Sequence, residues 1–250
     1  MNHRDLLWRG VFGRELGVIV TEPVAYKRPA LRRETITVPG RSGVLTIKQD
    51  DVYETVTYAP ALAILPGADK RAVYDWLRGS GRVVFGSMPD VEYEATIVGQ
   101  MDCTELIPGH PAWYETLIAT WECQPWKYPI VSASDIVFTG DADYALARWN
   151  PGNVASAPLI SAVVTPGTVL TLRIAGNEEC VLTAPDGEAD EMTVLLDCDA
   201  ESAYTLDGVS LDASMVGEYP VIPPGSWTAS CSAENGTLIK LTIQPRWRSV

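Results

Sequence analysis

The sequence predicts a mainly β protein made of two β-rich parts, with one short α-helix in the first part. Short segments rich in Val, Ile, Thr and aromatic residues recur along the 250 residues, and turn residues bound each of them. The 20 glycines and 18 prolines also suit a turn-rich chain of strands better than a helical one. Three observations therefore agree on the fold class: segment composition, turn frequency and the scarcity of helical spacing.

In the first part, the strand-like segments alternate or are continuously apolar over five or more residues. We expect strands at 16–22, 34–38, 44–48, 53–65, 82–86, 92–99 and 113–125. The segment GADKRAVYDWLRGSG instead places Ala72, Val73, Trp76 and Leu77 on one apolar stripe. With Asp69 as the N-terminal cap and Gly79 after the last turn, a helix of about ten residues is predicted, packed on a sheet.

After Tyr128 the composition changes to a loop-rich, more acidic stretch with several prolines and glycines. We place a domain boundary there, which gives a first domain of residues 1–130 and a second of 131–250. Strands then follow at short intervals, with turns at Pro166-Gly167, Gly176-Asn177 and Asn235-Gly236. About seven short strands without a helix predict an antiparallel β-sandwich.

The net charge of −13 is unevenly distributed between the two domains. Residues 1–130 hold 14 basic and 16 acidic residues, whereas residues 131–250 hold 5 and 16. A protein that grips nucleic acid needs a basic surface to displace counterions, so this function is disfavoured. The chain also has no apolar run long enough to cross a membrane as a helix, and its first residues do not resemble a secretory signal.

The segment ETITVPGRSGVLTIKQDD carries the glycines that most resemble a nucleotide-binding loop. A P-loop needs a lysine after its last glycine and a helix after that, whereas Gly43 is followed by a strand-like segment. A tight reversal explains the residues, because Pro39 presets one turn position and Gly40 accepts the positive φ beside it. We therefore expect a strand, a turn and a second strand, and no bound nucleotide.

Residues for nucleophilic catalysis or metal binding are scarce. The only two histidines, His3 and His110, lie in a terminus and in a loop, and no G-x-S-x-G motif is present. The five cysteines are odd in number and form no C-x-x-C pair, which indicates mostly buried, reduced thiols made in a cytoplasm. We expect no enzyme activity, no metal and no cofactor.

Carboxylates and aromatic residues of the second domain leave alternatives open. Nine acids lie in the segment from Asp186 to Asp212. The ordinary interpretation is a solvated acidic face, and the alternatives are a calcium site and a pair of acids that hydrolyses glycans. The tryptophans and tyrosines there could stack on sugars or anchor a core or an interface. The candidates for a sugar or partner contact are Trp149 and Trp227.

The order of motifs resembles the distal tail protein family of siphovirus-type bacteriophages and prophages. The turn VPGRSG with Pro39, Gly40 and Gly43, the helix ending in Trp76-Leu77, and the strand ATWECQPWKYP with Pro125 carry this resemblance over residues 1–130. The segments NPGNVASAPLI, GEYPVIPPGSW and IKLTIQPRWR of the second part are similar to the galectin-like sandwich of that family.

The resemblance implies a structural protein of the virion tail tip, made in the host cytoplasm. In that family the N-terminal domains form a homohexameric ring, and the galectin-like domain projects outward for docking. The implied partners are the tail tube protein, the tail-associated hub protein and receptor-binding or fibre proteins, with DNA passing through the ring unbound. A lumen without a net basic belt would suit that passage.

One departure from the family pattern concerns the second domain. A galectin sugar site uses a histidine, and both histidines lie in the first part, so that site is absent as such. Docking is therefore the expected role of the second domain. The alternative for the chain is a carbohydrate-binding or adhesin module of a phage or bacterial surface protein, with Trp149 or Trp227 as the stacking residue.

Overall fold

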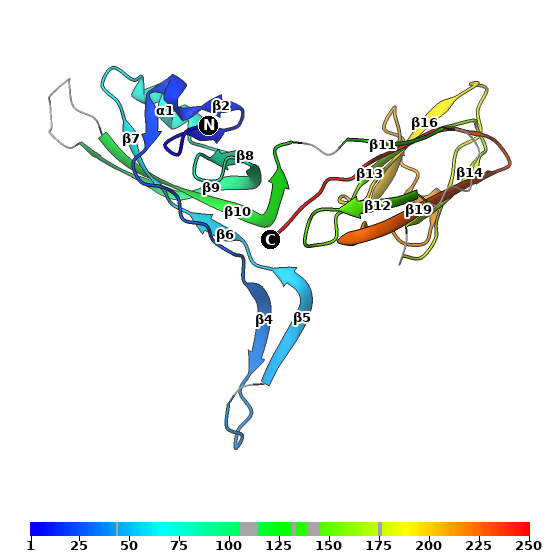
Figure 1. The fold of residues 1–250 in the computed structure, drawn as a ribbon, viewed down its shortest axis with the longest axis horizontal. Helices are drawn as coiled ribbons and strands as arrows, with labels where there is room; N and C mark the ends of the chain where they lie inside the picture. The colour runs from blue at the N-terminus through cyan, green and yellow to red at the C-terminus, as the bar shows by residue number, and fades with distance from the viewer. Residues whose placement is uncertain (44, 106–114, 132–133, 140–145, 175–176) are drawn as a thin grey trace. The chain divides into compact units, whose positions relative to one another are not determined.

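The computed structural model describes residues 1–43, 45–105, 115–131, 134–139, 146–174 and 177–250. The chain divides into two compact units, residues 1–130 and residues 131–249, and each is described by itself. Both units are built almost wholly of antiparallel strands (Figure 1). The predicted mainly β class, with one short α-helix, is confirmed. In the described part of the chain, no helix has the length and apolarity to cross a membrane.

An eight-stranded antiparallel sheet forms the centre of the first unit. Its order is β2-β1-β8-β9-β10-β7-β3, and β6 pairs with β10 beyond the end of β7. The two longest strands lie at its middle, which gives the sheet a continuous spine. The strands are β1 (Leu6–Trp8), β2 (Val11–Phe12), β3 (Val18–Val20), β6 (Val56–Tyr58), β7 (Ala61–Ile64), β8 (Ser80–Phe85), β9 (Val91–Glu105) and β10 (Glu115–Pro129).

One face of this sheet is buried against the α-helix and a short 3-10 helix, η1 (Gly13–Leu16). Along β10 every second side chain is buried, from Glu115 to Lys127, as the period of a half-buried strand requires. Pro125 is among the buried residues and lies in the register shift between Cys123 and Lys127, where a missing N–H does not interrupt the pairing.

The helix α1 (Lys70–Trp76) is shorter than the sequence predicts. Its N-cap is Asp69, whose carboxylate accepts hydrogen bonds from the backbone N–H groups of Arg71 (3.0 Å) and Ala72 (3.4 Å). Val73 and Trp76 are buried, as is Leu77, which already leaves helical geometry at ψ 55°. The helix ends there because β8 begins only three residues later, at Ser80.

Two further strands form a separate hairpin, which we name the arm. It consists of β4 (Leu31–Ile36) and β5 (Leu45–Tyr53), and these two strands make a sheet of their own. The arm projects away from the eight-stranded sheet of its unit (Figure 1). The predicted strand at 53–65 is divided in the structure, because its residues belong to the end of β5, to β6 and to β7.

The second unit is a sandwich of two five-stranded sheets. Their orders are β11-β20-β13-β16-β17 and β12-β19-β14-β15-β18, and the residues between them form one core. Asn235, with φ 59°, turns β19 into β20. The strands are β11 (Ile136–Thr139), β12 (Leu146–Asn150), β13 (Leu159–Val164), β14 (Val169–Ile174), β15 (Cys180–Thr183), β16 (Met192–Asp197), β17 (Ser202–Thr205), β18 (Met215–Val216), β19 (Gly225–Glu234) and β20 (Leu238–Gln244).

Candidate functional site: an exposed arm and an open sheet face

The tip of the arm is a reversal between two strands. The backbone N–H of Arg41 donates to the carbonyl of Val38 at 3.2 Å, which closes a four-residue turn around Pro39 and Gly40. Gly40 has φ 81°, a value that glycine adopts without strain. The turn joins β4 to β5, so no helix N-terminus is present to hold a phosphate, and the loop has the geometry of a plain turn.

Apolar side chains lie exposed along the arm. Ile36 is 42% exposed, Val38 37%, Leu45 41% and Val52 38%. A hairpin of two strands has too little apolar surface to bury on its own and is marginally stable in water. The arm therefore leaves apolar side chains exposed on a two-stranded sheet.

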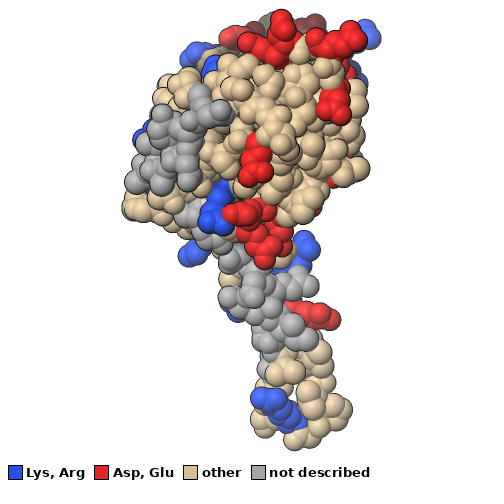
Figure 2. Space-filling model, turned by 90° about the vertical axis from the view of Figure 1, so that its right-hand side faces the viewer, with Lys and Arg blue, Asp and Glu red and all other residues tan. Residues whose placement is uncertain are grey.

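Basic residues gather on one strand of the arm and on the segment before it. Lys27, Arg28, Arg32 and Arg33 are all exposed, and the stretch 27–33 contains no acid. Lys and Arg also colour the far end of the arm, and an acidic side chain lies partway along it (Figure 2). The arm thus differs in charge from the rest of an acidic protein.

The base of the arm is fixed to the first unit. The backbone N–H of Glu54 donates to the carbonyl of Ala30 at 2.8 Å, and Leu31 is paired with Tyr53. The ring of Tyr53 meets the ring of Trp126 edge to face, with centroids 5.6 Å apart. The two backbone contacts close the base of the arm, and the ring contact joins it to β10 of the sheet.

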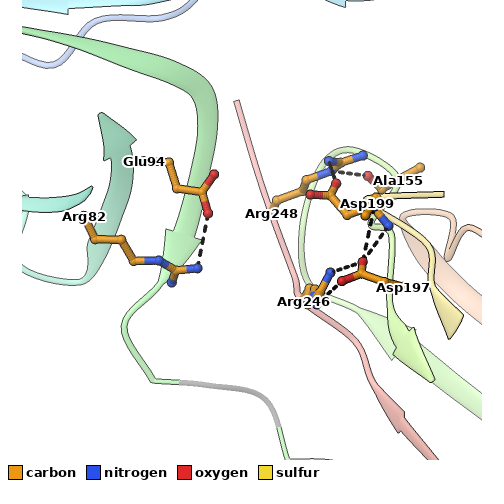
Figure 3. Close-up of polar contacts among 8 residues, drawn as sticks. Arg82, Glu94, Ala155, Asp197, Asp199, Arg246 and Arg248 are labelled. Atoms are coloured by element: carbon orange, nitrogen blue, oxygen red, sulfur yellow. Dashed lines mark hydrogen bonds and ion pairs between the residues drawn. The ribbon is translucent and has the colours of Figure 1, made fainter. Parts of the chain in front are cut away.

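The open face of the eight-stranded sheet carries small polar side chains and one arginine held by two acids. Arg82 of β8 forms ion pairs with Glu92 and with Glu94 of β9, the latter at 3.3 Å (Figure 3). Beside them the hydroxyls of Ser80 and Thr96 are hydrogen-bonded at 2.8 Å. A shallow, open depression of about 410 Å³ lies here, lined by Ser80, Gly81, Arg82, Glu94, Ala95, Thr96 and Gln124. The pairing of Arg82 leaves no excess positive charge in this depression.

Two acids of the second unit, Asp197 and Asp212, have structural partners. Asp197 accepts two hydrogen bonds from Arg246, at 2.7 and 3.1 Å (Figure 3). This contact lowers the pKa of Asp197 below its ordinary value. Asp212 accepts hydrogen bonds from the backbone N–H of Ala203 (2.6 Å) and from the hydroxyl of Tyr219 (3.0 Å). Among the residues that the structure describes, no three His, Cys, Asp or Glu side chains converge as metal ligands would.

The structure separates the two tryptophans that were candidates for a surface contact. Trp149 is 65% exposed on β12, whereas Trp227 is 2% exposed and belongs to the core of the sandwich. The prediction for Trp227 is therefore corrected, because a buried indole cannot stack on a ligand. The two could not be distinguished from the sequence, since burial depends on the packing of the two sheets. Of the two histidines, His110 lies outside the described residues.

Comparison with known proteins gives no match by sequence and a full-length match by structure. No family model and no curated protein matches the chain. The crystal structure of the Dit protein (gp 19.1) of phage SPP1 is similar to the chain with a TM-score of 0.66 at 14% identity. The match covers 95% of this chain and 97% of that protein. The chain has the fold of this Dit protein.

The similarity to Dit includes both units, because it leaves only a small part of either chain unmatched. Dit is described as a paradigm of the hub adsorption apparatus in phages that infect Gram-positive bacteria. Two structures of the activated phage P2 baseplate, with calcium and with strontium, are more distant. Their TM-scores are 0.47 and 0.48 at 8% and 9% identity, and each match covers about nine-tenths of this chain and of the baseplate chain.

Proposed function

We propose that the chain is a distal tail protein, a structural subunit of a phage baseplate hub. The single observation that carries this proposal is the fold shared with the SPP1 Dit protein over nearly the full length of both chains. The resemblance of the sequence motifs, found independently of the structure, points to the same family. In this role the chain transforms no substrate and acts by holding other tail proteins together at the tip of the virion.

The arm supports assembly into a closed ring of identical subunits. In the described part of the chain, β4 and β5 pair only with each other, so each strand leaves one edge of backbone groups unpaired. Such edges pair readily with a strand of another chain. A contact between different surfaces of identical subunits closes into a ring when its rotation permits, and we propose a homohexamer of residues 1–130.

The open face around Arg82 suits a channel through which DNA passes without being held. Arg82 is neutralised by Glu92 and Glu94, and its neighbours Ser80 and Thr96 are uncharged. A wall without surplus basic charge releases few counterions from DNA and so does not bind it. We propose that this face lines the lumen. A reconstruction showing a continuous Lys/Arg ring there would contradict that assignment.

Residues 131–250 are proposed as the outward domain that docks the other components. The partners proposed for the whole ring are the tail tube protein, the tail-associated hub protein and receptor-binding or fibre proteins. The location is the virion tail tip. The expected absence of catalysis, metal and cofactor belongs to the same proposal, because a docking ring needs shape and interfaces and no reacting group.

Light scattering tests the proposal. It is measured on the purified chain alone and on the chain mixed with the tail tube protein of the same phage. The expected particle contains six copies, either alone or in the mixture, and electron microscopy should show a ring. A chain that stays monomeric in both samples would contradict ring assembly. The tube protein is included because a ring that is completed only on the tube would otherwise be missed.

A shortened arm identifies the surface responsible. Replacing residues 34–47 by Asn-Gly joins Arg33 to Lys48, which are paired in the arm, through a two-residue hairpin turn. This variant should stay folded and lose ring formation, since Ile36, Val38 and Leu45 and the outer ends of both strands are removed. The double variant I36S/L45S, with the arm at full length, should weaken assembly in the same direction. Unchanged assembly in both variants would exclude the arm as the interface.

A further inference from the structure

The outer face of β12 and β19 in the second unit carries an exposed indole. Trp149 is 65% exposed, whereas the other tryptophans in the described part of the chain are buried or half-buried. A Cβ at Gly225 would lie 3.8 and 3.9 Å from Cζ3 and Cη2 of Trp149, so the indole rests against this glycine at the start of β19. The absence of a side chain at Gly225 lets the ring lie close to the sheet.

A row of hydroxyl groups follows the indole along the same face. Trp149 is paired with Ser226, and alternate residues of a strand point to one face of the sheet. The intervening residues of β19 are buried to within 2% exposure, so their neighbours point outward. The outward residues are Ser226, Thr228, Ser230 and Ser232. A hydroxyl both donates and accepts hydrogen bonds, and its short side chain leaves the face open.

An ion pair lies near the middle of this row. Arg173 of β14 is paired with Ser230, and its guanidinium forms an ion pair with Glu179 in which both side chains are about half exposed. The four-residue step from Ser226 to Ser230 corresponds to about 13 Å along an extended strand. The indole and the Arg173–Glu179 pair are thus separated by the length of two or three sugar rings, with hydroxyls between them.

We propose that this face binds a neutral glycan chain, with the sugar ring stacked on Trp149 and the following sugars hydrogen-bonded along β19. The C–H face of a sugar is weakly positive and meets the negative face of the indole. The hydroxyls of the sugar are both donors and acceptors, and so are the serine and threonine hydroxyls. The Arg173–Glu179 pair adds further donors and acceptors beside Ser230.

The charge of the domain decides between glycans and the other ligands that stack on tryptophan. Residues 131–250 hold 5 basic and 16 acidic residues, so the domain repels nucleic acid and anionic polysaccharides. A protein partner would in turn need a cluster of apolar anchors, and the outward side chains of β19 are hydroxyls and one glutamate. An uncharged polysaccharide is the class that fits both observations.

Native gel electrophoresis of the full chain in gels containing mannan, galactan or the anionic polysaccharide alginate tests the proposal. At least one neutral polysaccharide should retard the wild type, and alginate should not. Trp149→Ala should weaken binding about tenfold or more, because a stacked ring contributes at least that factor. Thr228→Ala combined with Ser230→Ala should weaken it less. Val216→Ala, at the opposite edge of the same sheet and 69% exposed, is the matched control and should bind as the wild type.

Several outcomes would overturn the site. They are a wild type that no neutral polysaccharide retards, retardation that Trp149→Ala leaves unchanged, and binding of a single-stranded oligonucleotide in place of the glycans. Light scattering of Trp149→Ala, with tube protein present, separates this proposal from the role in the hub. The variant should assemble as the wild type does, so a lost glycan site and a failed ring give different results.

Discussion

Trp8 and Trp76 exchange hydrogen bonds. The indole N–H of Trp8 donates to the backbone carbonyl of Trp76 at 2.9 Å, and the indole N–H of Trp76 donates to the carbonyl of Trp8 at 3.1 Å. The two residues lie 68 positions apart, one in β1 and one at the end of α1, and both are buried. This reciprocal pair fixes the helix to the sheet, and it explains why the helix ends in a tryptophan.

Replacing Trp76 by phenylalanine should destabilise the first unit by about 1–3 kcal/mol, because one buried hydrogen bond is lost and the side chain shrinks. Urea unfolding followed by circular dichroism measures this change. Trp149→Phe is the control, since Trp149 is 65% exposed and the change should shift stability by less than about 0.5 kcal/mol. Equal midpoints for the two variants would mean that the Trp8–Trp76 pair does not hold the helix.

The sequence allows the repetitive features of this fold to be predicted, because they depend on neighbours along the chain. The alternation of β10, the cap at Asp69 and the turn at Pro39-Gly40 are local patterns with a direct physical cause. Short elements are missed, since β1 and β2 hold only three and two residues. In the arm, β4 begins at Leu31, three residues before the predicted strand. The prediction missed this start because Arg32 and Arg33 break the apolar alternation.

Contacts between distant residues could not be predicted in this way. Arg246 and Asp197 are 49 positions apart, and neither sits in a motif that indicates the other. The same holds for Trp149, whose exposure depends on β12 being the edge strand of its sheet and on Gly225 beside it. The sequence predicts β-rich segments, whereas their order in the sheet decides which side chains reach the surface.

Asp69 should stabilise α1 through its cap. Asp69→Ala removes the acceptor for the N–H groups of Arg71 and Ala72 and should cost about 1 kcal/mol of folding stability, whereas Asp69→Asn keeps an acceptor and should cost less. Asp75→Ala is a matched loss of one carboxylate in the same helix. Its exposed ion pair with Arg78 (2.9 Å) should contribute less than about 0.5 kcal/mol. Thermal unfolding compares the variants, and an equal loss for Asp69→Ala and Asp75→Ala would contradict the capping role.

One of the five cysteines should react readily with a thiol reagent. Cys103 is exposed, and the other four cysteines are buried. Burial raises the pKa of Cys123 and of Cys198 to about 12 and that of Cys180 to about 11, which suppresses the reactive thiolate. Ellman's reagent at pH 8 should therefore titrate one thiol quickly in the folded protein and five after denaturation. Cys103→Ser should remove the fast phase, and a fast phase remaining in that variant would show that a buried thiol is accessible.

The paired contact between Asp197 and Arg246 should make the second unit more stable at neutral than at acid pH. The hydrogen bonds from Arg246 are the main cause that lowers the pKa of Asp197, so the carboxylate stabilises the fold above its ordinary pKa. That contribution is lost as the pH falls through the lowered pKa that Asp197 has in the folded state.

The variant Asp197→Asn tests this pH dependence. It keeps an acceptor for the N–H groups of Asp199 (3.1 Å) and Ala200 (3.2 Å) and removes only the charge. It should destabilise the protein by about 1–3 kcal/mol at pH 7, and the difference from the wild type should shrink below about pH 4. Asp199→Asn, which alters the more exposed contact with Arg248 (3.4 Å), should cost less than about 0.5 kcal/mol. Denaturant midpoints between pH 7 and pH 2.5 measure both variants, and a difference for Asp197→Asn that stays constant over this range would show that its carboxylate charge does not hold Arg246 in place.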